Sequence, residues 1–119
     1  MVLLALVIPA AHSAPDGAQI LQGCSAVIRQ QEGKDLSPDE TFAALFCLGY
    51  VSGVTDMVGL FPPQKNGRKL ICVPPSGISN DQAIRIVVKW LSSNPETLHQ
   101  IARTEIFLAL AKAFPCAEE

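Results

Sequence analysis

Apolar residues recur at helical spacing in several segments of the chain, and this pattern predicts a helical protein. One such segment covers residues 17–31. Two more cover residues 79–92 and 94–114; each begins with a residue type that caps helices, and Pro115 ends the last one. A more apolar segment lies between them, at residues 37–54. We therefore expect an all-α fold, a compact and bundle-like domain of four or slightly more helices with two disulfides.

The segment that begins at Ser37 has both a specific start signal and the most apolar sequence. Ser37 can cap a helix whose first residue is a proline, and Glu40 can return a hydrogen bond to close a capping box. Residues 41–54 are apolar on nearly every side, so we expect this helix to be central and buried. Gly49 and Gly53 lie one turn apart on one face, where they would let a neighbouring backbone approach closely. A transmembrane helix is the competing interpretation, which these glycines and the polar residues near them disfavour.

The N-terminus has the pattern of a secretory signal. Residues 2–8 form a short apolar run, and Pro9 and several small residues follow it, as in the core and cleavage zone of a signal peptide. We expect residues 1–14 to be that signal and residues 15–119 to be a single exported domain. The alternative is an N-terminal helix packed on the core, although the run lacks helical amphipathicity.

Four cysteines follow the signal segment: Cys24, Cys47, Cys72 and Cys116. An even number of cysteines behind an export signal indicates two disulfides in an oxidising compartment such as the periplasm. Three pairings are open, and we prefer Cys24 with Cys47 and Cys72 with Cys116, because each pair joins adjacent segments and the loops do not interlock. A zinc site is the alternative, but its ligands normally come in close pairs and no histidine stands beside these cysteines.

Charge and residue types restrict the kind of function. The formal net charge is −2 and no basic run exceeds two residues. We therefore expect that the mature protein neither binds nucleic acid nor inserts into a membrane. His99 is the one histidine after the signal segment, and no carboxylate pair, phosphate loop or metal triad accompanies it. We predict a protein that binds rather than catalyses, with no metal and no cofactor.

The last helical segment has a second apolar face, which a domain of this size has few elements to cover. The 79–92 segment likewise has an apolar arc wider than one neighbour would need. We predict that these two surfaces form a homodimer interface. Its residues are Ile86, Trp90, Phe107, Leu110 and Phe114.

An ordered set of motifs runs through the chain and is similar to the pattern of one family. The motifs are Phe46-Cys47-Leu48-Gly49-Tyr50-Val51-Ser52-Gly53-Val54-Thr55-Asp56, Ile71-Cys72-Val73-Pro74, Val87-Val88-Lys89-Trp90-Leu91, Pro95, Leu98-His99 and Ala113-Phe114-Pro115-Cys116. Over roughly residues 20–116 the chain resembles the Rap/Tai-type immunity proteins of type VI secretion. The resemblance implies a periplasmic, helical, disulfide-bonded protein, often dimeric, that neutralises a peptidoglycan-cleaving amidase injected by neighbouring bacteria. The implied mechanism is steric: a protruding element plugs the active-site cleft of the effector.

Residues 61–69 are our candidate for that protruding element. They contain two prolines, an Asn-Gly turn signal and three basic residues, which predict an exposed loop that is rigid at one end and basic at the other. Such a loop suits an acidic cleft. The candidate binding residues are Pro62, Pro63, Gln64, Lys65, Asn66, Arg68 and Lys69. An ordinary solvated loop is the alternative.

Two other functions compete with immunity. One is a periplasmic chaperone of the acid-stress type, which opens at low pH when many carboxylates are protonated. With only 17% charged residues, this chain has few groups to drive such a change. The other is a general helical binding protein with no toxin partner.

Overall fold

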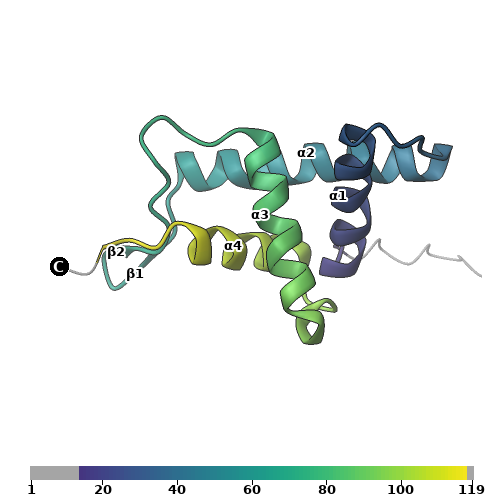
Figure 1. The fold of residues 1–119 in the computed structure, drawn as a ribbon. Coiled ribbons are helices and arrows are strands. Elements are labelled where there is room, and N and C mark those ends of the chain that lie inside the picture. The colour runs from purple at the N-terminus through teal and green to yellow at the C-terminus, as the bar shows by residue number, and fades with distance from the viewer. Residues whose placement is uncertain (1–13, 118–119) are drawn as a thin grey trace, which may run out of the picture.

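A computed structural model describes residues 14–117 of the chain. The elements are α1 (Gly17–Gln31), α2 (Pro38–Leu60), β1 (Gln64–Lys65), β2 (Arg68–Lys69), α3 (Asn80–Ser93), the 3-10 turn η1 (Pro95–Thr97) and α4 (Ala102–Ala113). α1 crosses α2, and α3 crosses both α2 and α4 (Figure 1). The all-α fold expected from the sequence is confirmed. The expected signal peptide, residues 1–14, falls almost wholly outside the described residues.

Side-chain caps fix where the helices begin. Asp16 caps α1 in a capping box with Gln19, and Ser37 caps α2 in the box predicted with Glu40. Ser79 caps α3, since its hydroxyl oxygen accepts a hydrogen bond from the Gln82 backbone N–H at 3.1 Å. These local signals therefore operate as the sequence indicates.

The core forms where α1 and α2 cross, and one glycine and one disulfide hold the crossing together. Cys24 and Cys47 are fully buried and bonded to each other, and Cys72 is bonded to Cys116, so the preferred pairing is confirmed. Gly23 is where the two backbones approach closely. A Cβ there would lie 2.2 Å from the Ala43 carbonyl oxygen, a distance that no side chain tolerates.

α2 is not the central, fully buried helix that its sequence predicts. Ala44, Cys47, Val51 and Val58 face the core, whereas the opposite face of the helix is exposed. We call that face the outer stripe; it consists of Phe42, Leu45, Phe46, Gly49, Gly53, Met57 and Leu60. A helix that is apolar all round does not indicate which side faces inward, and the neighbouring helices cover only one side.

The two glycines of the outer stripe do not serve the purpose expected of them inside the domain. A Cβ at Gly49 or Gly53 would meet no atom of residues 14–117 within 4 Å. By length and composition α2 is also able to cross a membrane, and 22% of its most apolar window is buried. Its inner face, however, is part of the core and is bonded to α1 through Cys47. α2 is thus a core helix with an uncovered side.

The expected single helix over residues 94–114 is divided, and the start of α1 explains the break. Residues 95–97 form η1, and Ile101 is extended before α4 begins at Ala102. Gly17 N–H donates to the Gln100 carbonyl oxygen at 2.9 Å, and Ala102 N–H donates to the Pro15 carbonyl oxygen at 2.8 Å. Backbone groups that a continuous helix would use internally bond instead to the segment that leads into α1.

Candidate functional site

Residues 61–69 fold as a short β-hairpin rather than the irregular loop expected. Gln64 pairs with Lys69 and Lys65 with Arg68, in antiparallel register. The turn residues Asn66 and Gly67 have φ angles of 53° and 76°. Positive φ at both central residues is the requirement of a tight hairpin turn whose twist matches its strands, and Asn-Gly meets it at low cost. The sequence signal for a turn was therefore correct, and the strands on either side of it were missed.

The base of the hairpin is fixed to the domain at several points. Leu70 N–H donates to the Pro63 carbonyl oxygen at 2.9 Å, and Pro62 and Pro63 are half-buried. Ile71 is buried in the core, with 3% of its surface exposed. The adjacent Cys72 is bonded to Cys116, and its N–H donates to the Phe114 carbonyl oxygen at 2.9 Å. The hairpin thus projects from a rigid base.

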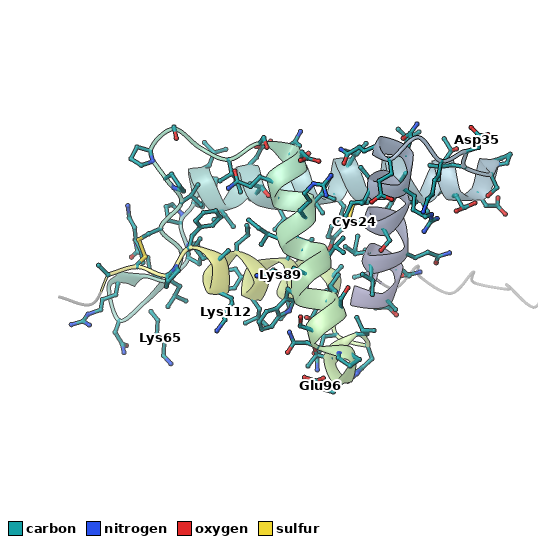
Figure 2. All side chains as sticks on the ribbon, in the orientation of Figure 1. Cys24, Asp35, Lys65, Lys89, Glu96 and Lys112 are labelled. Atoms are coloured by element: carbon teal, nitrogen blue, oxygen red, sulfur yellow. A yellow bond between two sulfur atoms is a disulfide. The ribbon has the colours of Figure 1, made fainter. Side chains whose placement is uncertain are left out.

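The hairpin presents a concentrated positive charge. Lys65, Arg68 and Lys69 are all exposed, and none of them forms an ion pair with an acidic residue in the described part of the chain. Lys65 lies on the hairpin at one end of the molecule, and Asp35 lies at the other end, beside the start of α2 (Figure 2). The predicted binding residues Gln64, Lys65, Asn66, Arg68 and Lys69 therefore share one exposed projection, with Pro62 and Pro63 at its base.

The opposite end of the molecule is acidic. Glu40 accepts hydrogen bonds from the Ser37 backbone N–H and from Arg29, while Asp35 and Asp39 are exposed beside it. The Ser37 backbone and hydroxyl contacts, followed by the Arg29 bond, hold the pKa of Glu40 below its usual value. Hydrogen bonds from Gln31 and Arg85 likewise lower the pKa of Asp81, at the start of α3. Glu40 and Asp81 therefore stay ionised at neutral pH.

An apolar groove of about 530 Å³ lies between α2, α4 and the base of the hairpin. Met57, Phe61 and Phe107 supply much of its lining, and Arg103 stands at its edge. This groove was not predicted from the sequence. The apolar sequence at the end of α2 indicates one wall of such a groove. The helix that forms the other wall, α4, starts more than 40 residues later, so the sequence does not show that the two walls lie side by side.

The surface predicted as a dimer interface is only partly accessible. Leu110 is completely buried in the core, so it cannot contact a second copy as predicted. Ile86, Trp90, Phe107 and Phe114 are half-buried. All four side chains pack against the core, and α3 and α4 also contact each other, so the wide apolar arcs of the two helices are largely used within the domain.

Glu105 is a buried acidic residue that was not predicted from the sequence. Its side chain is 0% exposed, and its Oε2 accepts hydrogen bonds from Trp90 Nε1 at 2.7 Å and from the Thr97 hydroxyl at 3.2 Å. Its Oε1 accepts no bond from residues 14–117. The contacts connect α3, η1 and α4. Its spacing from Ala102 and Ala109 indicates a position on the inner face of α4. The indole N–H of Trp90, on α3, needs a hydrogen-bond acceptor when it is buried.

The chemistry-bearing residues of the described chain are dispersed or already engaged. All four cysteines are in disulfides, and no group of three or more metal-ligating side chains occurs within residues 14–117. His99 lies in the exposed break before α4, with its Nε2 at 3.4 Å from the Gln100 amide nitrogen. What the described surface offers is a rigid cationic projection and an exposed apolar stripe, both of which are suited to binding.

Comparison with known proteins gives one family match. The family model described as Rap1a immunity proteins matches residues 16–116. No curated protein and no solved structure gives a significant match. The matched range includes every helix, the hairpin and both disulfides.

Proposed function

The chain belongs to the Rap1a immunity protein family, and we propose that it is a periplasmic immunity protein that blocks a peptidoglycan amidase effector of type VI secretion. The family match over residues 16–116 is the observation that supports an immunity function against a secreted effector. Two disulfides support an oxidising compartment, in which such an amidase would meet its substrate. Immunity proteins of this kind are generally not enzymes, so inhibition requires only a tight complex.

The hairpin is the element that we propose enters the active-site cleft of the effector. Its turn residues, its paired strands and its disulfide-bonded base fix its shape before binding, so little conformational entropy is lost on association. Lys65, Arg68 and Lys69 would meet carboxylates of the effector, which raises the association rate as well as the affinity. The adjacent groove with Met57 and Phe61 would receive an apolar anchor residue beside the cleft.

A direct test measures amidase inhibition by the oxidised mature protein, with the secretion-system amidase encoded beside it as partner. We expect the triple variant Lys65→Ala, Arg68→Ala, Lys69→Ala to weaken binding at least tenfold, in line with the loss of several interfacial charge pairs. The control removes two exposed lysines outside the hairpin, Lys89 and Lys112, and should leave inhibition unchanged. Inhibition that is equally strong in both variants would exclude the hairpin as the inserting element. No binding to any peptidoglycan hydrolase would exclude the proposed target class.

A homodimer forms part of the proposed function as well, as the resemblance implied. The half-buried α3–α4 surface is the smaller apolar area available for it, and the outer stripe of α2 is the larger one.

A further inference from the structure

The tip of the hairpin places a side-chain amide next to a backbone nitrogen that has no side chain beside it. Asn66 and Gly67 are both exposed. Within residues 14–117, neither the amide of Asn66 nor the N–H of Gly67 forms a hydrogen bond. Because glycine has no Cβ, a carbonyl carbon can approach its nitrogen without steric hindrance. The two groups are therefore free to react with each other.

The reaction that this pair supports is deamidation through a cyclic imide. The backbone nitrogen of Gly67 loses its proton to water and attacks Cγ of Asn66, so that an N–Cγ bond forms. The Cγ–Nδ2 bond breaks, and ammonia leaves. Water then opens the imide: opening at Cγ gives aspartate, and opening at the main-chain carbonyl gives isoaspartate, whose main chain is longer by a methylene group. Water is the only co-reactant, and nothing is oxidised or reduced.

The other two asparagines of the chain do not meet these conditions. Asn94 precedes Pro95, whose nitrogen has no hydrogen to lose, and its own amide donates to a backbone carbonyl of α3 at 2.8 Å. Asn80 precedes Asp81 within α3, where the helix fixes the backbone and the Cβ of Asp81 stands beside the nitrogen. Asn66 is therefore the asparagine at which the ring can form.

Ring closure requires the backbone between Asn66 and Gly67 to rotate out of its turn. Two residue pairs hold the tip, and no third strand lies beside them in the described structure. Such a short two-stranded hairpin opens locally more readily than its base, which the Cys72–Cys116 disulfide fixes. An effector that encloses the tip would hold the turn closed. Deamidation should therefore be faster in the free protein than in the complex.

We propose that Asn66 is a site of spontaneous deamidation that limits the active lifetime of the unbound immunity protein. The modification itself requires only this chain and water. Its effect on inhibition rests on the proposed function, in which the hairpin enters the active-site cleft of the effector.

Either product places a carboxylate at the centre of the basic projection. Lys65 and Arg68 flank the turn, and Lys69 follows them. A negative charge among them reduces the attraction to carboxylates of the effector and repels them at close range. Isoaspartate also lengthens the main chain in a turn that sets the register of the two strands. We therefore expect aspartate to weaken binding about tenfold, and isoaspartate to weaken it further.

The first experiment follows the modification in the oxidised mature protein. The protein is kept at mildly alkaline pH for days, and tandem mass spectrometry of its peptides locates each amide that becomes an acid. We expect both acidic products at Asn66 and no conversion at Asn80 or Asn94. An Asn66 that converts no faster than Asn80 would overturn the proposal. The secretion-system amidase encoded beside the chain should slow the conversion when it is added, and equal rates with and without it would contradict a limit specific to the unbound protein.

Amidase inhibition measures the consequence. Fresh Asn66→Asp should inhibit about tenfold more weakly than the wild type. The matched control Asn80→Asp adds the same charge at the exposed start of α3 and should inhibit as the wild type does. With time, the wild type should lose inhibition in proportion to its converted fraction. Asn66→Gly, which has no amide but suits the same type of turn, should keep the inhibition that it had when fresh.

These measurements separate the modification from the proposed function. Conversion of Asn66 with undiminished inhibition would overturn the lifetime limit, and so would an Asn66→Gly protein that loses inhibition as fast as the wild type. The Lys65→Ala, Arg68→Ala, Lys69→Ala variant then locates the failure. If this variant also inhibits normally, the hairpin is not the inserting element and the proposed function fails with it. If it is weakened, the hairpin inserts and only the role of Asn66 is wrong.

Discussion

The two sides of α2 are both apolar but have opposite environments. On the inner side, α1 crosses so closely that Gly23 has no room for a Cβ beside the Ala43 carbonyl, and the Cys24–Cys47 disulfide joins the helices at the same level. On the outer side, Gly49 and Gly53 face open space and large apolar side chains are exposed around them. Glycine at a helix surface thus has a structural role only where another backbone lies opposite it.

This difference implies that the two sides contribute to different equilibria. The inner side contributes to folding of the single chain, because its contacts are complete within the domain. The outer side gains nothing from folding and pays the helix-propensity cost of two glycines. It becomes favourable only if a partner covers it, and changes on the two sides should therefore separate stability from association.

The largest expected effect comes from filling the inner contact. Gly23→Val should destabilise the domain by about 4 kcal/mol or prevent folding, because its Cβ would meet backbone rather than a movable side chain. Urea unfolding followed by circular dichroism measures the change. Stability equal to that of the wild type would show that α1 and α2 can separate without cost, contrary to the close crossing described.

A smaller loss should follow from removing the disulfide at the crossing. Replacing Cys24 and Cys47 together by alanine opens a link between residues 23 positions apart and should cost about 3 kcal/mol by the chain-entropy account. The same unfolding experiment measures it. The protein should still fold, because the apolar contacts of the crossing remain, so an unfolded double variant would mean that these contacts are weaker than their burial indicates.

On the outer side of α2, adding a side chain at a glycine should raise the free energy of unfolding, whereas at Gly23 it should lower it. Gly49→Ala and Gly53→Ala are each expected to raise the unfolding free energy of the monomer by about 1 kcal/mol, because alanine has the higher helix propensity and meets no neighbour. The measurement is made at a protein concentration low enough to keep the chain monomeric. Destabilisation at either site would reveal an unrecognised intramolecular contact.

The smallest effect is expected from acid. Folding lowers the pKa of Glu40 from 4.5 and the pKa of Asp81 from 3.8. The contribution of these two groups to the free energy of unfolding is therefore complete above those values, and it is lost as the pH falls through the lower pKa values of the folded state. Asp81 is exposed and Glu40 is partly exposed, which keeps the effect small. We therefore expect native circular dichroism at about pH 2.5 and no acid-induced increase in the binding of a fluorescent apolar dye. Glu40→Gln should flatten the pH dependence; dye binding that appears only in acid would favour the chaperone function.

The extent to which the sequence predicted the candidate site varies from residue to residue. The turn at Asn66-Gly67 and the charges beside it were identified, because turn chemistry depends on two adjacent residues. The strands of the hairpin and the groove beside it were not, because they depend on how residues 61–70 pack against the ends of α2 and α4. Glu105 was missed for a related reason: its spacing from Ala102 and Ala109 places it on the inner face of α4, but only the packing of α3 against α4 brings the Trp90 indole N–H opposite it.

By itself, the sequence determined the features of this protein that depend on short-range interactions or on chain order. These are the capped helix starts at Ser37 and Ser79, the extent of α1, and a disulfide pairing that joins adjacent segments. Only the tertiary structure decided that Gly23 rather than Gly49 would accept a neighbouring backbone, and that the helix expected at residues 94–114 would break at Ile101. The physical reason is that capping and helix propensity act within one or two turns, whereas the inward side of an apolar helix and the partners of its backbone groups are set by residues far away in the chain.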